Sequence, residues 1–292
     1  MFLKPKHLKV LFPLFLVFIL IFTGCTVTVK TSGNNSNSNT EVDNLKVHYI
    51  DIGQGDSVLI QYKDKNMLID AGPRSSSDKL VKYLKGIGVN KINIVVATHP
   101  HEDHIGGIVA VLNNFPVEKF YAPQKTNNTK TFEKMVSTLK EKNLKINVAK
   151  KGVSLDFHSD IKAEMLAPNS ENYENINNYS AVVKLNYGEN SFLFMGDAEK
   201  ISEKEIVQKN LDLKSDVIKL GHHGSSTSSS KEFLDKVDAK YAIISCAKGN
   251  DYGHPHKEIV EDMKNRNITV YRTDLQGDIV ITSDGKNIKS DK

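Results

Sequence analysis

The sequence has 292 residues, of which 39 % are hydrophobic and 25 % are charged, and its formal net charge is +4. This composition is ordinary for a folded protein, so it excludes a chain that is disordered throughout and one with many membrane spans. Two cysteines cannot form the framework of a disulfide-rich protein. The length allows one large domain or two small ones.

The N-terminus has the pattern of an export signal. Three lysines precede an apolar run of 13 residues from Val10 to Phe22, which is short for a membrane span and typical of a signal-peptide core. Small residues then lead to Cys25, an arrangement that resembles the lipobox of bacterial lipoproteins. We therefore expect residues 1–24 to be a lipoprotein signal peptide and Cys25 to carry the lipid. An uncleaved N-terminal anchor is the alternative.

Either arrangement holds the protein at the cell membrane, on its extracytoplasmic face. Residues 25–44 contain the lipidated cysteine and a segment rich in Ser, Asn, Thr and Gly, which we expect to be a flexible linker. Removal of residues 1–24 lowers the basic residues from 39 to 36 against 35 acidic ones, for a net charge of +1. The basic excess therefore belongs mostly to the signal and gives no argument for a nucleic-acid partner.

Residues 45–292 are expected to form the folded domain, in which strands and helices alternate. In chain order, the predicted strands are Val47–Asp51, Ser57–Tyr62, Asn66–Asp70, Ile92–Ala97, Ile161–Leu166, Ala181–Tyr187, Ser191–Met195, Val217–Leu220, Ala239–Ser245, Thr269–Tyr271 and Asp278–Thr282. The predicted helices are Asp78–Ile87, Thr131–Lys142, Glu199–Lys209, Lys231–Val237 and Lys257–Asn265. This order favours an α/β fold, for which a four-layer αββα sandwich is one packing.

The strongest chemical signal follows the predicted strand Ile92–Ala97. Three histidines and two carboxylates lie within the six residues from His99 to His104, and imidazole and carboxylate groups are ligands that suit Zn²⁺. Residues two apart in an extended loop point the same way, so His99 and His101 can hold one metal. Asp103 and His104 can turn to a second metal.

Three later motifs also follow predicted strands. Asp197 can bridge two cations or cap the helix that follows it. Of His222 and His223, one is expected to complete the shell of the second metal and the other to face the substrate. For the pair His254 and His256, substrate contact and a local structural role both remain open.

A glycine-rich run, Asp51-Ile-Gly-Gln-Gly-Asp-Ser57, lies between the first two predicted strands. It lacks the Gly-Lys-Ser/Thr ending of a phosphate-binding loop and is followed by another strand, so we reject that interpretation. We expect a tight turn that places Gln54 and Asp56 at the edge of the site.

The pattern His99-x-His101-x-Asp103-His104 resembles the signature of the metallo-β-lactamase superfamily, whose fold is the αββα sandwich. Further stretches resemble the C-terminal hydrolase domain of ComEC-type competence proteins, here as a stand-alone lipoprotein. These stretches are Asp51–Ser57, Leu68–Gly72, Asn177–Ser180, Gly196–Ala198, His222–Ser225 and Tyr252–His256.

The resemblance implies a centre with two Zn²⁺ ions, Mn²⁺ being the alternative. The implied metal ligands are His99, His101, Asp103, His104, Asp197 and His223, with Asp197 bridging. Asp70 would orient these ligands. Where the superfamily has a further histidine, this sequence has Asn177–Ser180, so the first metal would have fewer ligands. Either it binds weakly, or an amide and a water complete its shell, with Asn178 as the supporting residue.

The function that we expect is that of a metal-dependent hydrolase, which uses a metal-bound hydroxide with Asp103, His222 and His254 as catalytic side chains. Its substrate is expected to be a phosphodiester outside the cytoplasm, with nucleic acid a candidate. One alternative is the hydrolysis of another envelope phosphodiester, an ester or a lactam. Another is a non-catalytic envelope protein that binds metal or DNA. The sequence indicates a membrane partner through the lipid anchor and does not identify any protein partner.

Overall fold

A computed structural model describes residues 43–292 together with Phe2. The signal peptide, the lipidation site Cys25 and the linker predicted for residues 25–44 lie outside the described residues, apart from Phe2, Asp43 and Asn44. Among the described residues, no helix has the length and apolar character needed to cross a membrane.

The described residues form two β-sheets. The eight-stranded sheet has the order β14 (Ile288–Ser290), β13 (Ile279–Ser283), β1 (Leu45–Tyr49), β2 (Val58–Tyr62), β3 (Lys65–Ile69), β4 (Ile92–Val96), β5 (Val117–Ala122) and β6 (Ile146–Val148). The six-stranded sheet has the order β12 (Thr269–Arg272), β11 (Tyr241–Ile244), β10 (Val217–Lys219), β9 (Asn190–Phe194), β8 (Val182–Tyr187) and β7 (Ile161–Ala167). In both sheets the strands that lead into the histidine and aspartate motifs run parallel.

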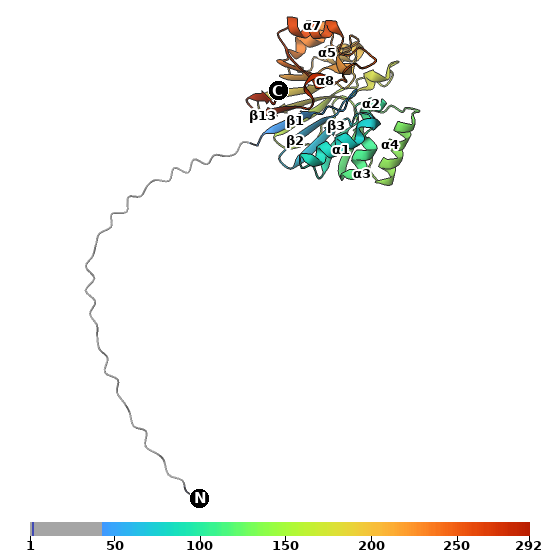
Figure 1. Cartoon of the computed structure of the whole chain (residues 1–292), viewed down its shortest axis with the longest axis vertical. Coiled ribbons are helices and arrows are strands. Elements are labelled where there is room, and N and C mark those ends of the chain that lie inside the picture. Colours follow the sequence, from blue (N-terminus) through green and yellow to red (C-terminus); the bar gives the residue numbers. More distant parts are fainter. Residues whose placement is uncertain (1, 3–42) are drawn as a thin grey trace, which may run out of the picture. The chain divides into compact units, whose positions relative to one another are not determined.

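Helices cover the outer face of each sheet (Figure 1). The eight-stranded sheet carries α1 (Ser77–Gly86), α2 (Glu102–Ile105), α3 (Ile108–Asn114) and α4 (Lys130–Glu141). The six-stranded sheet carries α5 (Lys200–Gln208), α6 (Lys231–Val237) and α7 (Lys257–Asn265), while the short α8 (Thr273–Gln276) follows β12. The predicted four-layer αββα sandwich is therefore confirmed.

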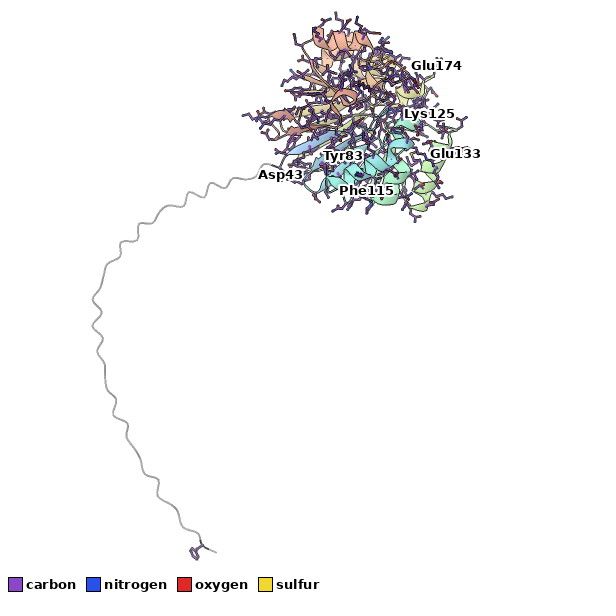
Figure 2. All side chains as sticks on the ribbon, in the orientation of Figure 1. Asp43, Tyr83, Phe115, Lys125, Glu133 and Glu174 are labelled. Atoms are coloured by element: carbon purple, nitrogen blue, oxygen red, sulfur yellow. The ribbon has the colours of Figure 1, made fainter. Side chains whose placement is uncertain are left out.

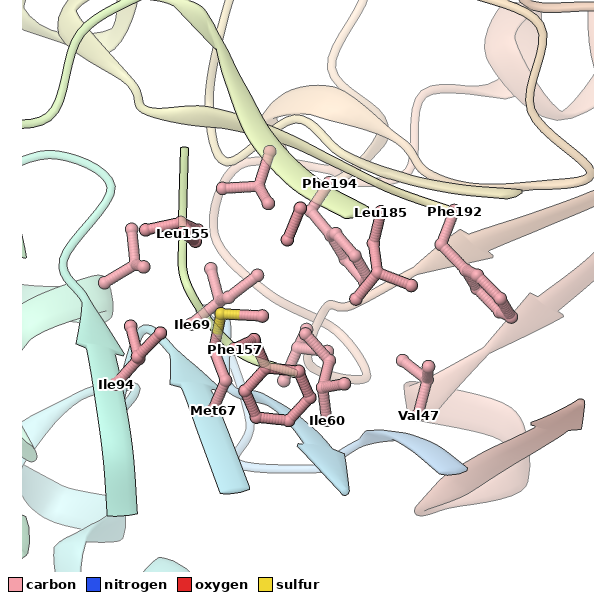
Figure 3. Close-up of a cluster of buried hydrophobic side chains, with 14 of the residues drawn as sticks. Val47, Ile60, Met67, Ile69, Ile94, Leu155, Phe157, Leu185, Phe192 and Phe194 are labelled. Atoms are coloured by element: carbon pink, nitrogen blue, oxygen red, sulfur yellow. The ribbon is translucent and has the colours of Figure 1, made fainter. Parts of the chain in front are cut away.

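Three hydrophobic layers hold these elements together. Side chains of both sheets interdigitate in the central layer, where Met67 and Ile94 face Phe194 and Leu185 (Figure 3). The outer layers lie between each sheet and its helices, and Figure 2 shows Phe115 on the helical side of the eight-stranded sheet. Central parallel strands such as β4 are buried along their whole length because both of their faces are covered.

The sequence missed several short elements. Strands β5, β6 and β14 and helices α3 and α8 were not predicted. The edge strand β6 exposes all three of its residues, so it carries none of the alternation from which a strand is predicted.

Candidate metal centre

The candidate site lies where loops at the carboxyl ends of several strands meet. The loop after β4, which continues into α2, carries His99 to His104. The loop after β9 carries Asp197, and the loop after β10 carries His222 and His223. The carboxyl ends of the neighbouring parallel strands β9 and β10 lie at one edge of the six-stranded sheet. The segment that follows β4 of the eight-stranded sheet meets them there. The rings and carboxylates of these three loops approach one another closely.

A three-donor group consists of His99, His101 and Asp197. The Nε2 atom of His99 lies 2.9 Å from Nδ1 of His101 and 3.7 Å from Oδ2 of Asp197. One candidate ligand atom from each residue lies within 4.8 Å of the others. His99 and Asp197 are buried and His101 is half-buried, so this group is the more open side of the centre.

A four-donor group consists of Asp103, His104, Asp197 and His223. Oδ1 of Asp197 lies 3.3 Å from Nε2 of His104 and 3.5 Å from Nε2 of His223. Oδ2 of Asp103 lies 3.3 Å from the same atom of His223. Asp197 therefore belongs to both groups, with one oxygen directed to each.

The four-donor group contains unpaired polar atoms of the kind that ligate cations. Nε2 of His104, Nε2 of His223 and Oδ1 of Asp197 are buried and have no hydrogen-bond partner among the described residues. Buried polar atoms in folded proteins are nearly always paired. Three unpaired atoms that face one another therefore fit a divalent cation with nitrogen and oxygen ligands, and the two groups together form a candidate dinuclear metal site.

Hydrogen bonds fix the histidines of this group in the form that binds metal. Nδ1 of His104 donates to Oδ2 of Asp70 at 2.8 Å, and Nδ1 of His223 donates to the carbonyl of Ser245 at 2.9 Å. Both acceptors lack protons, so Nδ1 carries the proton and the lone pair of Nε2 is free. The Asp70 carboxylate also accepts from the N–H and O–H of Thr98, at 2.8 and 2.7 Å, so it lies behind the donors.

The charges of the group are strongly coupled. Burial opposes a positive charge on His104 and His223, but Asp197 and the neighbouring carboxylates outweigh it. They raise the pKa of His104 well above its usual value and that of His223 to about 9. Burial likewise opposes the negative charge of Asp197, but the two rings hold its pKa well below the usual range. Without a cation these rings take up protons, which a binding cation must displace.

Residues 50–248 match the family described as the Metallo-beta-lactamase superfamily, and this range contains every donor of both groups. The chain belongs to the metallo-beta-lactamase superfamily. Its donor set makes it a metal-dependent hydrolase of that superfamily.

Named relatives in the superfamily include competence proteins. The chain is 32 % identical over 252 residues to ComE operon protein 3 of Bacillus subtilis, covering 80 % of this chain and 32 % of that protein. It is 31 % identical over 229 residues to competence protein ComA of Neisseria gonorrhoeae, covering 78 % and 30 %. The chain thus spans about a third of the length of these curated relatives.

A solved structure shares the fold at low identity. The metallo-beta-lactamase fold protein YhfI from Bacillus subtilis superposes with a TM-score of 0.56 and 14 % identity, over 82 % of this chain and 100 % of that chain. This likeness agrees with the two-sheet architecture described above.

Of the two adjacent histidines, His223 is a member of the four-donor group and His222 lies outside both groups. Nδ1 of His222 lies 3.0 Å from Oγ1 of Thr227 and 3.3 Å from Oε1 of Glu199. Its Nε2 lies 3.9 Å from Oδ2 of Asp197, and 23 % of the side chain is exposed. His222 is therefore beside the centre and open to solvent.

His254 extends this open side of the superfamily centre. Its ring centroid lies 5.3 Å from that of His222, and the ring of Tyr252 stacks on it at 5.7 Å and 21°. Tyr252 is 66 % exposed. His256 instead accepts a hydrogen bond from the backbone of Ser226 and holds that loop in place.

The expected role of Asn178 needs correction. Its Oδ1 accepts hydrogen bonds from the N–H groups of Glu199, at 3.1 Å, and Ser202, at 3.3 Å. The first N–H groups of a helix need outside acceptors, and Asn178 supplies one at the start of α5. This oxygen is therefore not free to support a metal held by His99 and His101.

Asp56 is also placed differently from the expectation. It is 2 % exposed, so it lies beneath the site and not at its edge. Gly55 lets the loop pass close to the backbone of Asp103, because a Cβ atom there would lie 2.2 Å from the Asp103 oxygen. Gln54 accepts from the N–H of Ala247 at 3.2 Å. The glycine-rich sequence predicts the turn, but it does not predict that the Asp56 side chain points into the protein.

Proposed function

We propose that this chain is a two-cation phosphodiesterase that acts outside the cytoplasm. The observation that carries the proposal is the position of Asp197, whose two oxygens face two different donor groups. Two cations that share a carboxylate are typical of phosphatases and nucleases. One similar protein is named a competence protein, which makes nucleic acid the first substrate class to test.

The proposal assigns the donor groups to the two cations. The ligands of the first cation are His99, His101 and Asp197, and those of the second are Asp103, His104, His223 and Asp197. Zn²⁺ suits these nitrogen and oxygen donors, and Mn²⁺ is tested beside it. When bound, the cations lower the pKa of coordinated water and withdraw charge from the bond that breaks.

Among the described residues, His222 is well placed to hold a proton for the leaving oxygen. Glu199 and Thr227 contact its Nδ1 and orient the ring, which leaves Nε2 at the open side near Asp197. A general acid needs a ring that is held in place within reach of the leaving group. His254 packs against His222 and contacts the substrate beside it. Asp103 is the most exposed member of the four-donor group, and its carboxylate adds negative charge at the open side of the centre.

The proposed location rests on the N-terminal sequence. Lipid attached to Cys25 would hold the domain at the outer face of the membrane, and the linker would separate the domain from the membrane surface. In cells that express the Cys25→Ser variant, the protein is expected to move from the membrane fraction to the soluble or secreted fraction. Retention of this variant in the membrane would favour the uncleaved anchor.

The test of the activity measures metal content and hydrolysis of bis(p-nitrophenyl) phosphate by the full chain with Zn²⁺ and with Mn²⁺. The Asp197→Ala variant removes the shared carboxylate. The control is Asp160→Ala, which removes a carboxylate that pairs with Lys63 on the surface. We expect metal-dependent turnover that Asp197→Ala abolishes and Asp160→Ala preserves.

Two outcomes would contradict the proposal in different ways. Two bound cations without turnover of the phosphodiester would move the assignment to an ester or lactam substrate, which is then tested directly. No bound cation and no turnover with either metal would favour a non-catalytic binding protein. Turnover that survives Asp197→Ala would show that another site is responsible.

A further inference from the structure

A buried ion pair that the sequence did not indicate lies directly behind the metal centre. Lys219 is the last residue of β10 in the six-stranded sheet, and Asp56 lies in the loop between β1 and β2 of the eight-stranded sheet. The two side chains are in contact and are 1 % and 2 % exposed. The pair therefore connects the two sheets beneath the loops that carry the donors.

Asp56 contacts three members of the four-donor group. Its Oδ1 lies 3.3 Å from Nδ1 of His223, and its Oδ2 lies 4.0 Å from Nδ1 of His104. Its backbone N–H donates to the carbonyl of Asp103 at 3.2 Å. One residue thus faces both rings on the side opposite their metal-binding nitrogens and also holds the backbone of the third donor.

Lys219 reaches the fourth donor through its neighbour. Its Nζ donates to the carbonyl of Gly196 at 3.3 Å, and Gly196 directly precedes Asp197. Gly196 has a φ of +52°, and a Cβ atom there would lie 2.9 Å from Cβ of Thr98. The backbone that aims the Asp197 carboxylate is therefore held from below by the lysine.

The charge of Lys219 also suits this position. Four buried or largely buried carboxylates, Asp56, Asp70, Asp103 and Asp197, surround the two rings. Like charges in a buried site repel one another, and an unpaired buried charge is strongly destabilising. A lysine that pairs with Asp56 offsets part of this repulsion whether or not cations are bound.

We propose that the Asp56–Lys219 pair positions the four-donor group before a cation arrives, and that it sets the cation affinity of this group selectively. The pair contacts residues of the four-donor group and, through Gly196, the shared Asp197. His99 is held by Thr98 and Ser180, and His101 lies against His99. The inference rests on the two-cation centre of the proposed function but not on its substrate.

The test is a Co²⁺ and Zn²⁺ titration of the metal-free full chain, followed by competition with a chelating indicator and by Co²⁺ absorption. The variant is Lys219→Met, which keeps the apolar length of the side chain and removes its charge. We expect one of the two binding equivalents to weaken by about 10- to 100-fold, as is typical for residues that support metal ligands, and the other to change less than about threefold.

The control is Lys184→Met. Lys184, in β8 of the same sheet, is also 1 % exposed. It also pairs with a carboxylate, that of Asp212, at 2.9 Å. Both variants leave a carboxylate without its lysine, so both are expected to lower the melting temperature. The positioning role predicts that Lys184→Met leaves both cation affinities unchanged.

A second variant keeps the test decisive if Lys219→Met does not fold. In the double variant Asp56→Asn with Lys219→Met, both members of the pair are uncharged, so neither is left as an unpaired buried charge. Stability is therefore expected to recover, while the affinity of one binding equivalent stays low. Unchanged affinities, equal loss of both equivalents, or the same loss in Lys184→Met would overturn the inference. If the wild-type chain binds no cation at all, the metal centre itself fails, and with it the proposed function.

Discussion

The Nδ1–H of His104 donates a 2.8 Å hydrogen bond to Oδ2 of Asp70, whose carboxylate is fully buried. The same oxygen accepts the hydroxyl proton of Thr98, whose oxygen lies 3.1 Å from Nδ1 of His99. One carboxylate therefore orients a ring of the four-donor group directly and a ring of the three-donor group through a hydroxyl. Partners of this kind fix which ring nitrogen faces a metal.

The first prediction is that Asp70→Asn weakens the binding of cations by about 10- to 100-fold. The amide has the same shape, but its NH₂ group only donates. It therefore loses either the hydrogen bond from the Thr98 N–H or those from His104 and the Thr98 hydroxyl. Competition with a chelating indicator measures the affinity. Asp216→Asn is the matched control, because Asp216 bonds Ser191 in the six-stranded sheet. An affinity that matches the control would show that Asp70 does not orient the centre.

The second prediction separates two adjacent histidines. His223→Ala removes a member of the four-donor group. This variant is therefore expected to bind about one cation in place of two and to lose most of its turnover. His222→Ala leaves both groups complete and is expected to keep both cations while kcat falls by about 10²- to 10⁴-fold, the usual range for general acid–base groups. Metal analysis and steady-state rates are measured on the same samples. Loss of metal in His222→Ala, with metal retained in His223→Ala, would make His222 the metal ligand and His223 the proton donor.

The sequence predicted much of the fold and many candidate donors, for identifiable reasons. Apolar strands end in His or Asp motifs, and parallel strands bring such ends together. From the residues alone the roles of His222 and His223 could not be separated, and only the family resemblance assigned His223 to the metal. Both residues take left-handed backbone angles, with φ of 49° and 54°, which turn adjacent rings to different partners. Lys219 was missed because a lysine in an apolar strand carries no sign of a buried partner 163 positions earlier in the chain.

The third prediction concerns the exposed ring of Tyr252, which stacks on His254 beside the centre. If single-stranded nucleic acid is the substrate, a base can stack on the outer face of this ring. Tyr252→Ala is then expected to raise KM for a single-stranded oligonucleotide by about tenfold or more with little change in kcat, since one base–aromatic stack contributes about 1–3 kcal/mol.

Two controls accompany this measurement. Tyr252→Phe keeps the stacking ring and is expected to behave like the wild type. An oligonucleotide with abasic residues in place of bases should show no difference between wild type and Tyr252→Ala. An equal change in KM for the abasic strand would mean that Tyr252 supports the loop and does not bind a base.

The last prediction concerns the dependence of stability on pH, away from the metal centre. His48 in β1 is 5 % exposed, and burial, followed by the nearby charge of Lys46, lowers its pKa to about 4. The folded state therefore favours the neutral ring. This contribution to stability is complete above pH 6.5, the pKa of an unfolded histidine, and is lost as the pH falls towards 4.

Between pH 7 and pH 5 this histidine is expected to account for about 2 kcal/mol of the loss in unfolding free energy. Urea denaturation of the metal-free chain at both values measures it, and His48→Gln should reduce the difference by that amount. Tyr83→Phe removes the hydroxyl that lies 2.9 Å from Nδ1 of His48 but keeps the ring buried. Because burial is the main cause of the pKa shift, this variant should keep the pH dependence of the wild type. If the variant loses this pH dependence, the hydrogen bond from Tyr83 is the cause of the shift instead.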